Sequence, residues 1–133
     1  MTRKAIVWAV ATTVLLPVLG SCDSGPKAGE LPVELVTPQA QLGAASFKVT
    51  ATSPASIDSV VPVCQGCTVY MARVSDREVR GVVTGPFGPG PLIGVLVPDL
   101  SLRDAYAFQL FELAAPDYTL RNLTGSSLRI ISN

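Results

Sequence analysis

The chain has 133 residues with ten basic and ten acidic side chains, so its length predicts one small domain and its balanced charge makes nucleic acid a poor ligand. It contains no histidine, which excludes Ser/His and Cys/His catalysis, histidine-ligated metal or haem, and a histidine pH switch. Hydrophobic residues make up 48% and charged residues 15%, with 11 Gly and 11 Pro, a balance typical of a β-rich fold with many turns.

The N-terminal segment has the three-part pattern of a secretory signal. Arg3 and Lys4 give a positive start, an uncharged run follows over residues 5–16, and small residues then lead to Cys22. As a helix the run would rise about 18 Å, which is short of the roughly 30 Å hydrocarbon core of a membrane. We therefore expect a cleaved signal peptide over residues 1–21 rather than a permanent membrane span.

The end of this segment, Leu19-Gly20-Ser21-Cys22, resembles the lipobox of bacterial lipoproteins. The resemblance implies cleavage before Cys22, a diacylglycerol on its sulfur and a further acyl chain such as palmitate on its amine. Because two or more acyl chains hold a protein stably on a bilayer, Cys22 would anchor the chain to the extracytoplasmic face of the cell membrane. An ordinary signal peptide, or an uncleaved anchor that happens to contain Cys22, is the alternative.

Cleavage before Cys22 would leave eight basic and ten acidic residues, and so no basic surface for nucleic acid or anionic lipid. Residues 22–32 then comprise the lipidated cysteine and a small, Gly- and Pro-containing stretch that we expect to be a flexible tether. The folded domain is predicted to span residues 33–133.

From residue 31 onward, short apolar or alternating runs are separated by turn residues at intervals of about eight to twelve residues, as in a β-sandwich. The clearest run, residues 47–52, would place Phe47, Val49 and Ala51 on the core face of a strand. Strands are predicted over residues 33–37, 47–52, 57–63, 68–75, 78–84, 92–97, 105–113, 118–123 and 128–132.

Residues 105–115 are rich in helix formers, so a helix is the alternative to the strand that we prefer there. A pattern upstream of this segment resembles the tyrosine corner of immunoglobulin-like and fibronectin type III domains. It consists of Val95 and Val97, the following Pro-Asp-Leu, and then Tyr106. The resemblance implies an immunoglobulin-like antiparallel β-sandwich in which the Tyr106 hydroxyl binds backbone near residues 100–103.

A second resemblance lies further along the chain. Residues 116–120, Pro-Asp-Tyr-Thr-Leu, are similar to the start of a terminal strand in the immunoglobulin-like intracellular proteinase inhibitor family. The match is too short to assign an inhibitory residue, and a fold does not by itself imply a function.

Cys64-Gln65-Gly66-Cys67 is the one motif whose side chains could react or bind a metal. Thr68 stands where haem attachment needs histidine, which excludes haem. A structural disulfide is favoured because an exported chain meets an oxidising compartment; its short loop would contribute roughly 2 kcal/mol. Thiol redox chemistry, and copper(I) binding with Met71 as a third soft ligand, stay open as alternatives.

Two further stretches are conspicuous. Residues 85–91, Gly-Pro-Phe-Gly-Pro-Gly-Pro, are predicted to form a loop that either presents Phe87 to a partner or folds it back onto the core. Residues 73–80 alternate in charge around a predicted hairpin turn, as a solvated face does.

The sequence thus predicts a lipid-anchored, extracytoplasmic β-sandwich that is not an enzyme and has no cofactor or metal. It would act as a binding or structural module of the cell envelope and meet a protein or polymer partner through loops or an exposed edge strand. A thiol redox or copper(I)-handling protein using Cys64 and Cys67 is one alternative, and a protease-inhibitor-like module is another.

Overall fold

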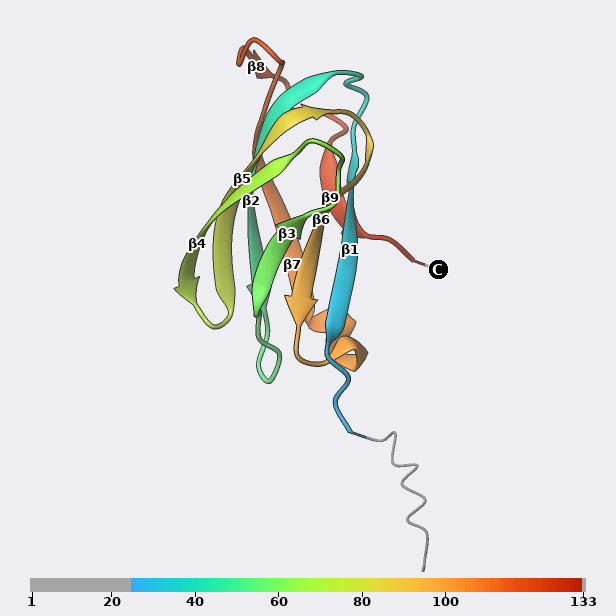
Figure 1. Ribbon diagram of the computed structural model, residues 1–133, viewed down its shortest axis with the longest axis vertical. Helices are drawn as coiled ribbons and strands as arrows, with labels where there is room; N and C mark the ends of the chain where they lie inside the picture. The colour runs from blue at the N-terminus through green and yellow to red at the C-terminus, as the bar shows by residue number, and fades with distance from the viewer. Residues whose placement is uncertain (1–24, 133) are drawn as a thin grey trace, which may run out of the picture.

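The computed structural model in Figure 1 describes residues 25–132. The predicted signal peptide and Cys22 lie outside the described residues, so their processing stays a prediction. The described chain forms nine strands and one 3-10 helix, η1. In chain order these are β1 (Gly29–Val36), β2 (Leu42–Ala51), β3 (Ser59–Pro62), β4 (Thr68–Ser75), β5 (Glu78–Phe87), β6 (Gly90–Val97), η1 (Leu100–Ala105), β7 (Tyr106–Ala114), β8 (Leu120–Arg121) and β9 (Ser127–Ile130).

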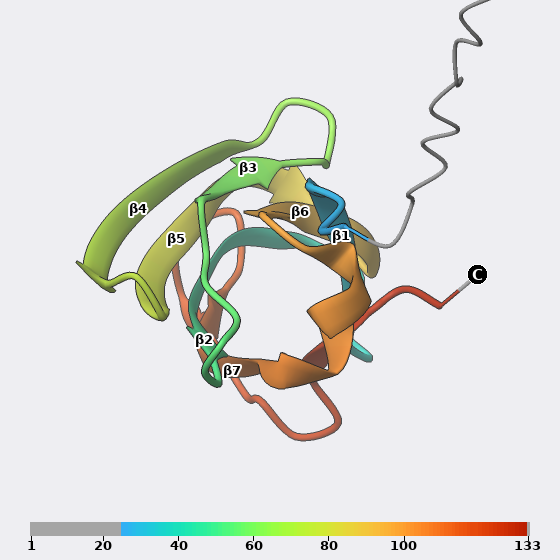
Figure 2. The same cartoon turned by 90° about the horizontal axis from the view of Figure 1, so that it is seen from below.

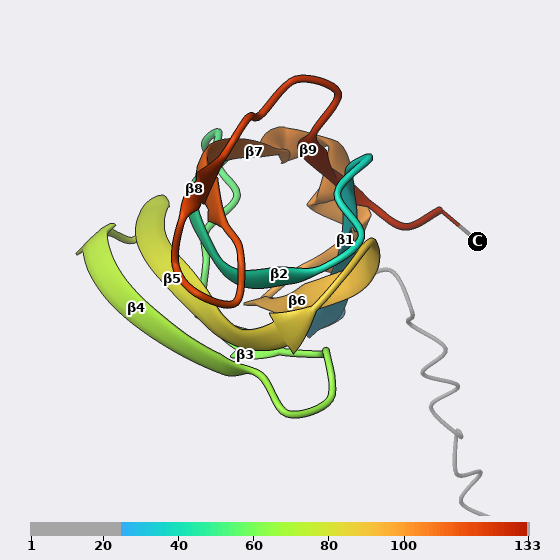
Figure 3. The same cartoon turned by 90° about the horizontal axis from the view of Figure 1, so that it is seen from above.

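The strands build two antiparallel sheets that face each other across one core (Figures 2 and 3). One sheet has the order β3-β6-β1-β9 and the other β4-β5-β2-β7-β8. The prediction of an all-β antiparallel sandwich is therefore confirmed. Its strand order is particular: in immunoglobulin constant domains the first two strands are neighbours in one sheet, whereas here β1 and β2 lie in opposite sheets.

The core lies between the sheets and follows the period of two in the sequence. On β2, Phe47 and Val49 are 1% and 0% exposed, while Lys48 between them points to the other face. Val33 of β1 and Val95 of β6, both 0% exposed, close the core from the facing sheet. Burying such side chains from water is the main term that holds the two sheets together.

The predicted strands all occur, and the segment that was ambiguous between strand and helix is a strand. β7 pairs with β2 from Ala51 opposite Tyr106 to Ala44 opposite Ala114, so tertiary pairing decides against helix propensity there. The predicted hairpin of residues 68–75 and 78–84 also forms as β4 and β5.

Several boundaries differ from the sequence prediction, and β2 begins at Leu42, five residues before the predicted start. β1 begins at Gly29 and buries Leu31, so the sandwich includes residues assigned to the tether, because pairing with β6 extends it. Residues 85–91 are mostly strand rather than loop, with only residues 88–89 between β5 and β6. β8 is reduced to two residues.

A 3-10 helix that the sequence analysis did not predict precedes β7. The Asp99 side chain caps η1 by accepting from the Ser101 N–H at 3.0 Å and from the Ser101 hydroxyl at 2.7 Å. The hydrogen bond from the Ser101 hydroxyl contributes most to holding the pKa of Asp99 below its ordinary value, and the hydrogen bond from the Ser101 N–H comes next. No helix in residues 25–132 is long and apolar enough to cross a membrane.

Tyr106, the first residue of β7, is 7% exposed and its hydroxyl donates to the Ser56 carbonyl oxygen at 2.5 Å. A buried tyrosine bonded to backbone was predicted, but the acceptor lies between β2 and β3 and not in residues 100–103. The reason is that the Thr52 N–H donates to the Ala105 carbonyl at 2.9 Å, which brings this segment beside Tyr106. Burial raises the pKa of Tyr106 above its ordinary value.

Candidate functional site

Cys64 and Cys67 form a disulfide with their Cα atoms 5.5 Å apart. The bridge closes the turn between β3 and β4, which is one of the points where the chain crosses from one sheet to the other. Gly66 has a φ of 79°, the left-handed conformation that this tight turn requires. The predicted role of the pair as a staple of a turn between two strands agrees with this placement.

The disulfide turn packs directly on β5. A Cβ added at Gly85, whose φ is 133°, would lie 2.8 Å from the Gly66 carbonyl oxygen and 3.0 Å from the Cys67 Cα. Only glycine allows so close an approach of the two backbones. The turn is therefore in close contact with β5 at Gly85.

The copper(I) hypothesis offered Met71 as an additional soft ligand for the cysteine pair. Met71 lies on β4, and four residues of extended strand separate its Cα from that of Cys67 by about 13 Å. Within residues 25–132 the structure contains no group of three or more His, Cys, Asp or Glu side chains placed to hold a metal ion. The structure thus does not bring Met71 to the Cys64–Cys67 pair.

Phe87 ends β5 opposite Leu42 of β2. Its ring is partly buried and packs against the hydrophobic core. Of the two roles left open by the sequence, this placement matches the ring that folds back. Its role in binding stays a prediction, and the packing of the ring argues against it.

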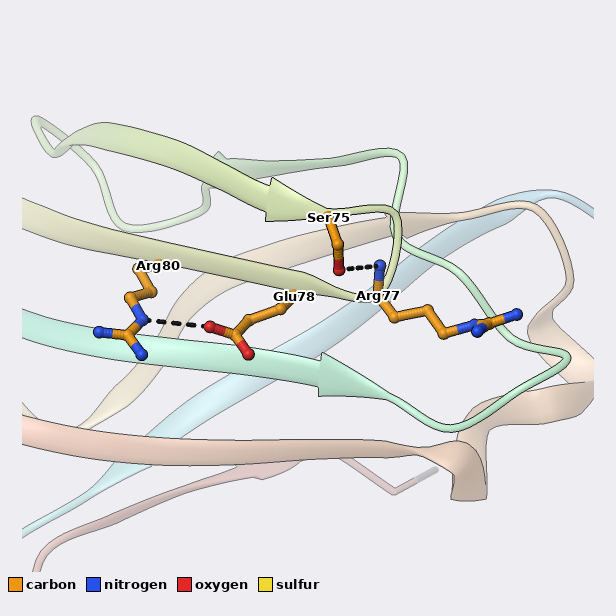
Figure 4. Close-up of polar contacts among 4 residues, drawn as sticks. All are labelled: Ser75, Arg77, Glu78 and Arg80. Carbon is orange, nitrogen blue, oxygen red and sulfur yellow. Dashed lines mark hydrogen bonds and ion pairs between the residues drawn. The ribbon is translucent and has the colours of Figure 1, made fainter.

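The charged stretch 73–80 forms the β4–β5 hairpin, shown in Figure 4. Arg80 and Glu78, on the same face of β5, form an ion pair at 3.2 Å, and the Ser75 hydroxyl accepts from the Arg77 N–H at 3.1 Å. The Arg73 guanidinium donates to the Ile57 and Asp58 carbonyls at 2.8 and 2.6 Å. The side chain of Arg73 is thus tied to the segment before β3.

The outer face of the β4-β5-β2-β7-β8 sheet carries apolar side chains that the sequence analysis did not single out. Tyr70 is 63% exposed, Val82 37% and Phe111 36%. Soluble proteins expose single apolar residues freely, but a cluster of them on one face indicates a surface that meets another molecule. β4 is also one of the two edge strands of this sheet among the described strands, because it pairs only with β5.

Strand pairing explains how these side chains meet. Val82 of β5 lies opposite Tyr70 of β4 on one side and Ser46 of β2 on the other. Directly opposed residues point to the same face of a sheet, so these three side chains form one row across it. Phe111 joins them because the β2–β7 register shifts beside Ser46, which leaves Phe111 as the extra residue of a β-bulge.

A hollow of about 410 Å³ opens between these side chains. It is open because small residues, Ser46 and Ala72, lie between the larger ones. It is lined by Ser46, Phe47, Tyr70, Met71, Ala72, Arg80, Gly81, Val82 and Phe111. We call these residues, together with Lys48, the outer-face hollow.

Two cations lie on the same side of the hollow. Lys48 of β2 is directly opposite Arg80 of β5. The Lys48 Nζ and the Arg80 Cζ are each 6.0 Å from the centroid of the Phe111 ring. At this distance each cation is attracted to the face of the ring, although the contribution at an exposed site is modest, about 0.5–1 kcal/mol.

The hollow could have been suspected from two signals in the sequence. Residues 68–75 do not alternate between apolar and polar side chains as a strand that covers a core does, and in the structure β4 is exposed along nearly its whole length. Phe111 is also out of phase with Tyr106, Phe108 and Leu110. What the sequence lacks is the pairing that places four strands side by side.

No protein-family model, curated protein or solved structure matches this chain. The fold and the geometry of the site therefore define the class of protein by themselves. They describe a small antiparallel β-sandwich, stapled by one disulfide, with an exposed apolar hollow on the outer face of one sheet.

Proposed function

We propose that this protein is a non-catalytic binding module of the cell envelope, held on the extracytoplasmic face of the membrane through Cys22, and that it binds its partner at the outer-face hollow. The observation that carries the proposal is the gathering of Tyr70, Val82 and Phe111 around a hollow of about 410 Å³. Aromatic residues and Met, with Arg, are the side chains enriched at protein interfaces.

The placement of the N-terminal end supports a tethered module. Figure 1 shows the first described residues leaving the sandwich at the end that carries η1, and β8 at the opposite end. β4 and β5, which carry part of the hollow, lie along the side of the sandwich between these ends. A tether that starts before Gly29 would leave this side free for a partner.

Site-specific photocrosslinking in the native host tests the proposal. A photoreactive amino acid at position 70 is expected to crosslink one discrete envelope component, and Phe111→Ser is expected to abolish that product. The matched control is the same photoreactive residue at Arg129, which is exposed on β9 of the other sheet. Equal crosslinking from both positions, or a product that Phe111→Ser leaves unchanged, would contradict the binding role of the hollow.

The anchor is tested separately. Intact mass spectrometry of the membrane-extracted protein is expected to show an acylated N-terminus at Cys22. Alkylation is expected to label Cys64 and Cys67 only after reduction. A pair that labels without reduction would instead favour the redox or copper(I) alternative.

A further inference from the structure

Of the two cations beside the outer-face hollow, Lys48 forms no ion pair within the described residues. Lys48 and Arg80 are directly opposed on neighbouring strands, and like charges in this position destabilise a sheet. Glu78 pairs with Arg80 at 3.2 Å. Among the described residues, Lys48 has no carboxylate within the 4.0 Å of an ion pair. Glu112 of β7, opposite Ser46, lies on the same face but forms no ion pair with Lys48. Lys48 is therefore a cation without an ion-pair partner at the edge of an apolar hollow.

We infer that the outer-face hollow receives a protein segment that carries a bulky apolar side chain next to a carboxylate. The apolar side chain enters the hollow between Tyr70, Val82 and Phe111, and the carboxylate pairs with Lys48. This inference rests on the proposed binding role of the hollow and adds the chemistry of its partner.

A protein segment fits the hollow better than a free amphiphile does. The hollow is open to solvent on the face of a sheet, and Tyr70, at 63% exposure, stands at its rim. A small ligand is usually enclosed over most of its surface by a concave site, which this face does not provide. A protein surface covers the rim as well as the centre, and so excludes water from the contacts that carry the binding energy.

The charge also makes the binding specific. A carboxylate that approaches Lys48 gains an attraction to this cation that is strengthened as water leaves the interface. A partner with a basic residue at the same place would face the unpaired Lys48 cation. The hollow therefore selects the sign of the partner's charge as well as its apolar side chain.

The test uses the full chain, extracted from its host and reconstituted in lipid nanodiscs, with a displayed library of short random peptides as the probe. Wild-type protein is expected to enrich peptides in which Asp or Glu stands next to a bulky apolar residue. Lys48→Glu is expected to remove that preference. Lys27→Glu, the matched charge reversal near the N-terminal end of the described chain, is expected to enrich the same peptides as wild type.

Fluorescence anisotropy with one enriched peptide gives the magnitude. We expect Lys48→Glu to weaken its Kd about tenfold, which corresponds to about 1.4 kcal/mol, and Lys27→Glu to leave it unchanged. We expect the Lys48→Glu variant to fold, because it replaces the like-charged Lys48–Arg80 pair with a pair of opposite charges. The new pair with Arg80 offsets the lost contact between Lys48 and the Phe111 ring, so the unfolding midpoint of the variant is expected to stay close to that of wild type.

Distinct results overturn the inference and the proposed function. If the enriched peptides lose binding to Val82→Ser but show no preference for Asp or Glu, the inference alone is overturned. The same holds if they bind Lys48→Glu with the wild-type Kd. If dodecanoate displaces the peptides and binds more tightly than they do, the occupant is a lipid, and this result also overturns the inference. If no enriched peptide is sensitive to Val82→Ser, both the inference and the binding role of the hollow fail.

Discussion

Replacing Tyr106 by Phe tests the contact that joins β7 to the segment between β2 and β3. The substitution keeps the ring, which is 7% exposed, and removes only the hydroxyl that donates to the Ser56 carbonyl at 2.5 Å. A lost intramolecular hydrogen bond costs about 0.5–1.5 kcal/mol, and more when the remaining partner stays unsatisfied. Ser56 is only half-buried, so water can reach its carbonyl, and we expect a loss of about 1 kcal/mol.

The assay is thermal and urea unfolding followed by circular dichroism. For a domain of this size a loss of 1 kcal/mol lowers the Tm by about 4–8 °C. The urea m-value is expected to stay the same, because the surface exposed on unfolding does not change. Tyr118→Phe is the matched control: Tyr118 is 67% exposed, and its variant is expected to unfold at the wild-type midpoint. If Tyr106→Phe unfolds at the midpoint of this control, the hydroxyl does not stabilise the fold.

The same residue predicts a dependence on alkaline pH. Burial raises the pKa of Tyr106 in the folded state, so at high pH the unfolded chain releases this proton first. The stability contributed by Tyr106 is therefore fully present below the ordinary tyrosine pKa of about 10 and is lost as the pH rises through the folded-state pKa. Unfolding measured across this range is expected to show a shallower loss of stability in Tyr106→Phe. An identical slope in both proteins would contradict the effect of burial.

Three other predictions concern the anchor, the sheet and the disulfide. Cys22→Ser is expected to release or misprocess the protein in cell fractionation, and a variant that is cleaved and fully membrane-retained would contradict the lipobox. Gly81→Ala is expected to destabilise the fold by about 1–3 kcal/mol in urea unfolding, because its Cβ would lie 2.7 Å from the Phe47 Cζ. The control Gly25→Ala, whose Cβ would have no atom within 4 Å, is expected to be neutral. Replacing both cysteines of the 64–67 pair by Ala is expected to cost no more than about 2 kcal/mol, and a larger loss would mean that the turn does more than shorten a loop.

Local chemistry explains how far the fold could be read from the chain. The period of two in residues 47–52 predicted the burial of Phe47 and Val49 on β2, because side chains alternate along a strand wherever it pairs. The turn residues in the sequence separated the strands for a similar reason, since Gly and Pro act on the backbone locally. The tight turn at Gly66 and the Cys64–Cys67 bridge also needed only neighbouring residues.

The predictions that failed all depended on a segment far away in the chain. The predicted tether, residues 22–32, was too long because the sequence of this segment does not show that Leu31 pairs with Val95. Residues 85–91 were taken as a loop because of their Gly and Pro content, although Phe87 pairs with Leu42 and Gly90 with Leu35. The acceptor of the Tyr106 hydroxyl was placed near in sequence, whereas Ser56 is 50 residues away.

By itself, the sequence determined the class of fold, the disulfide turn and the expectation of a lipid anchor, because hydrophobic period, turn chemistry and a cleavage motif are local properties. Only the tertiary structure decided where a partner can bind. Tyr70, Val82 and Phe111 come from three strands, and Lys48 from a fourth. They form one surface because antiparallel pairing and a bulge in β7 fix the register between strands, and register is a property of the assembled sheet.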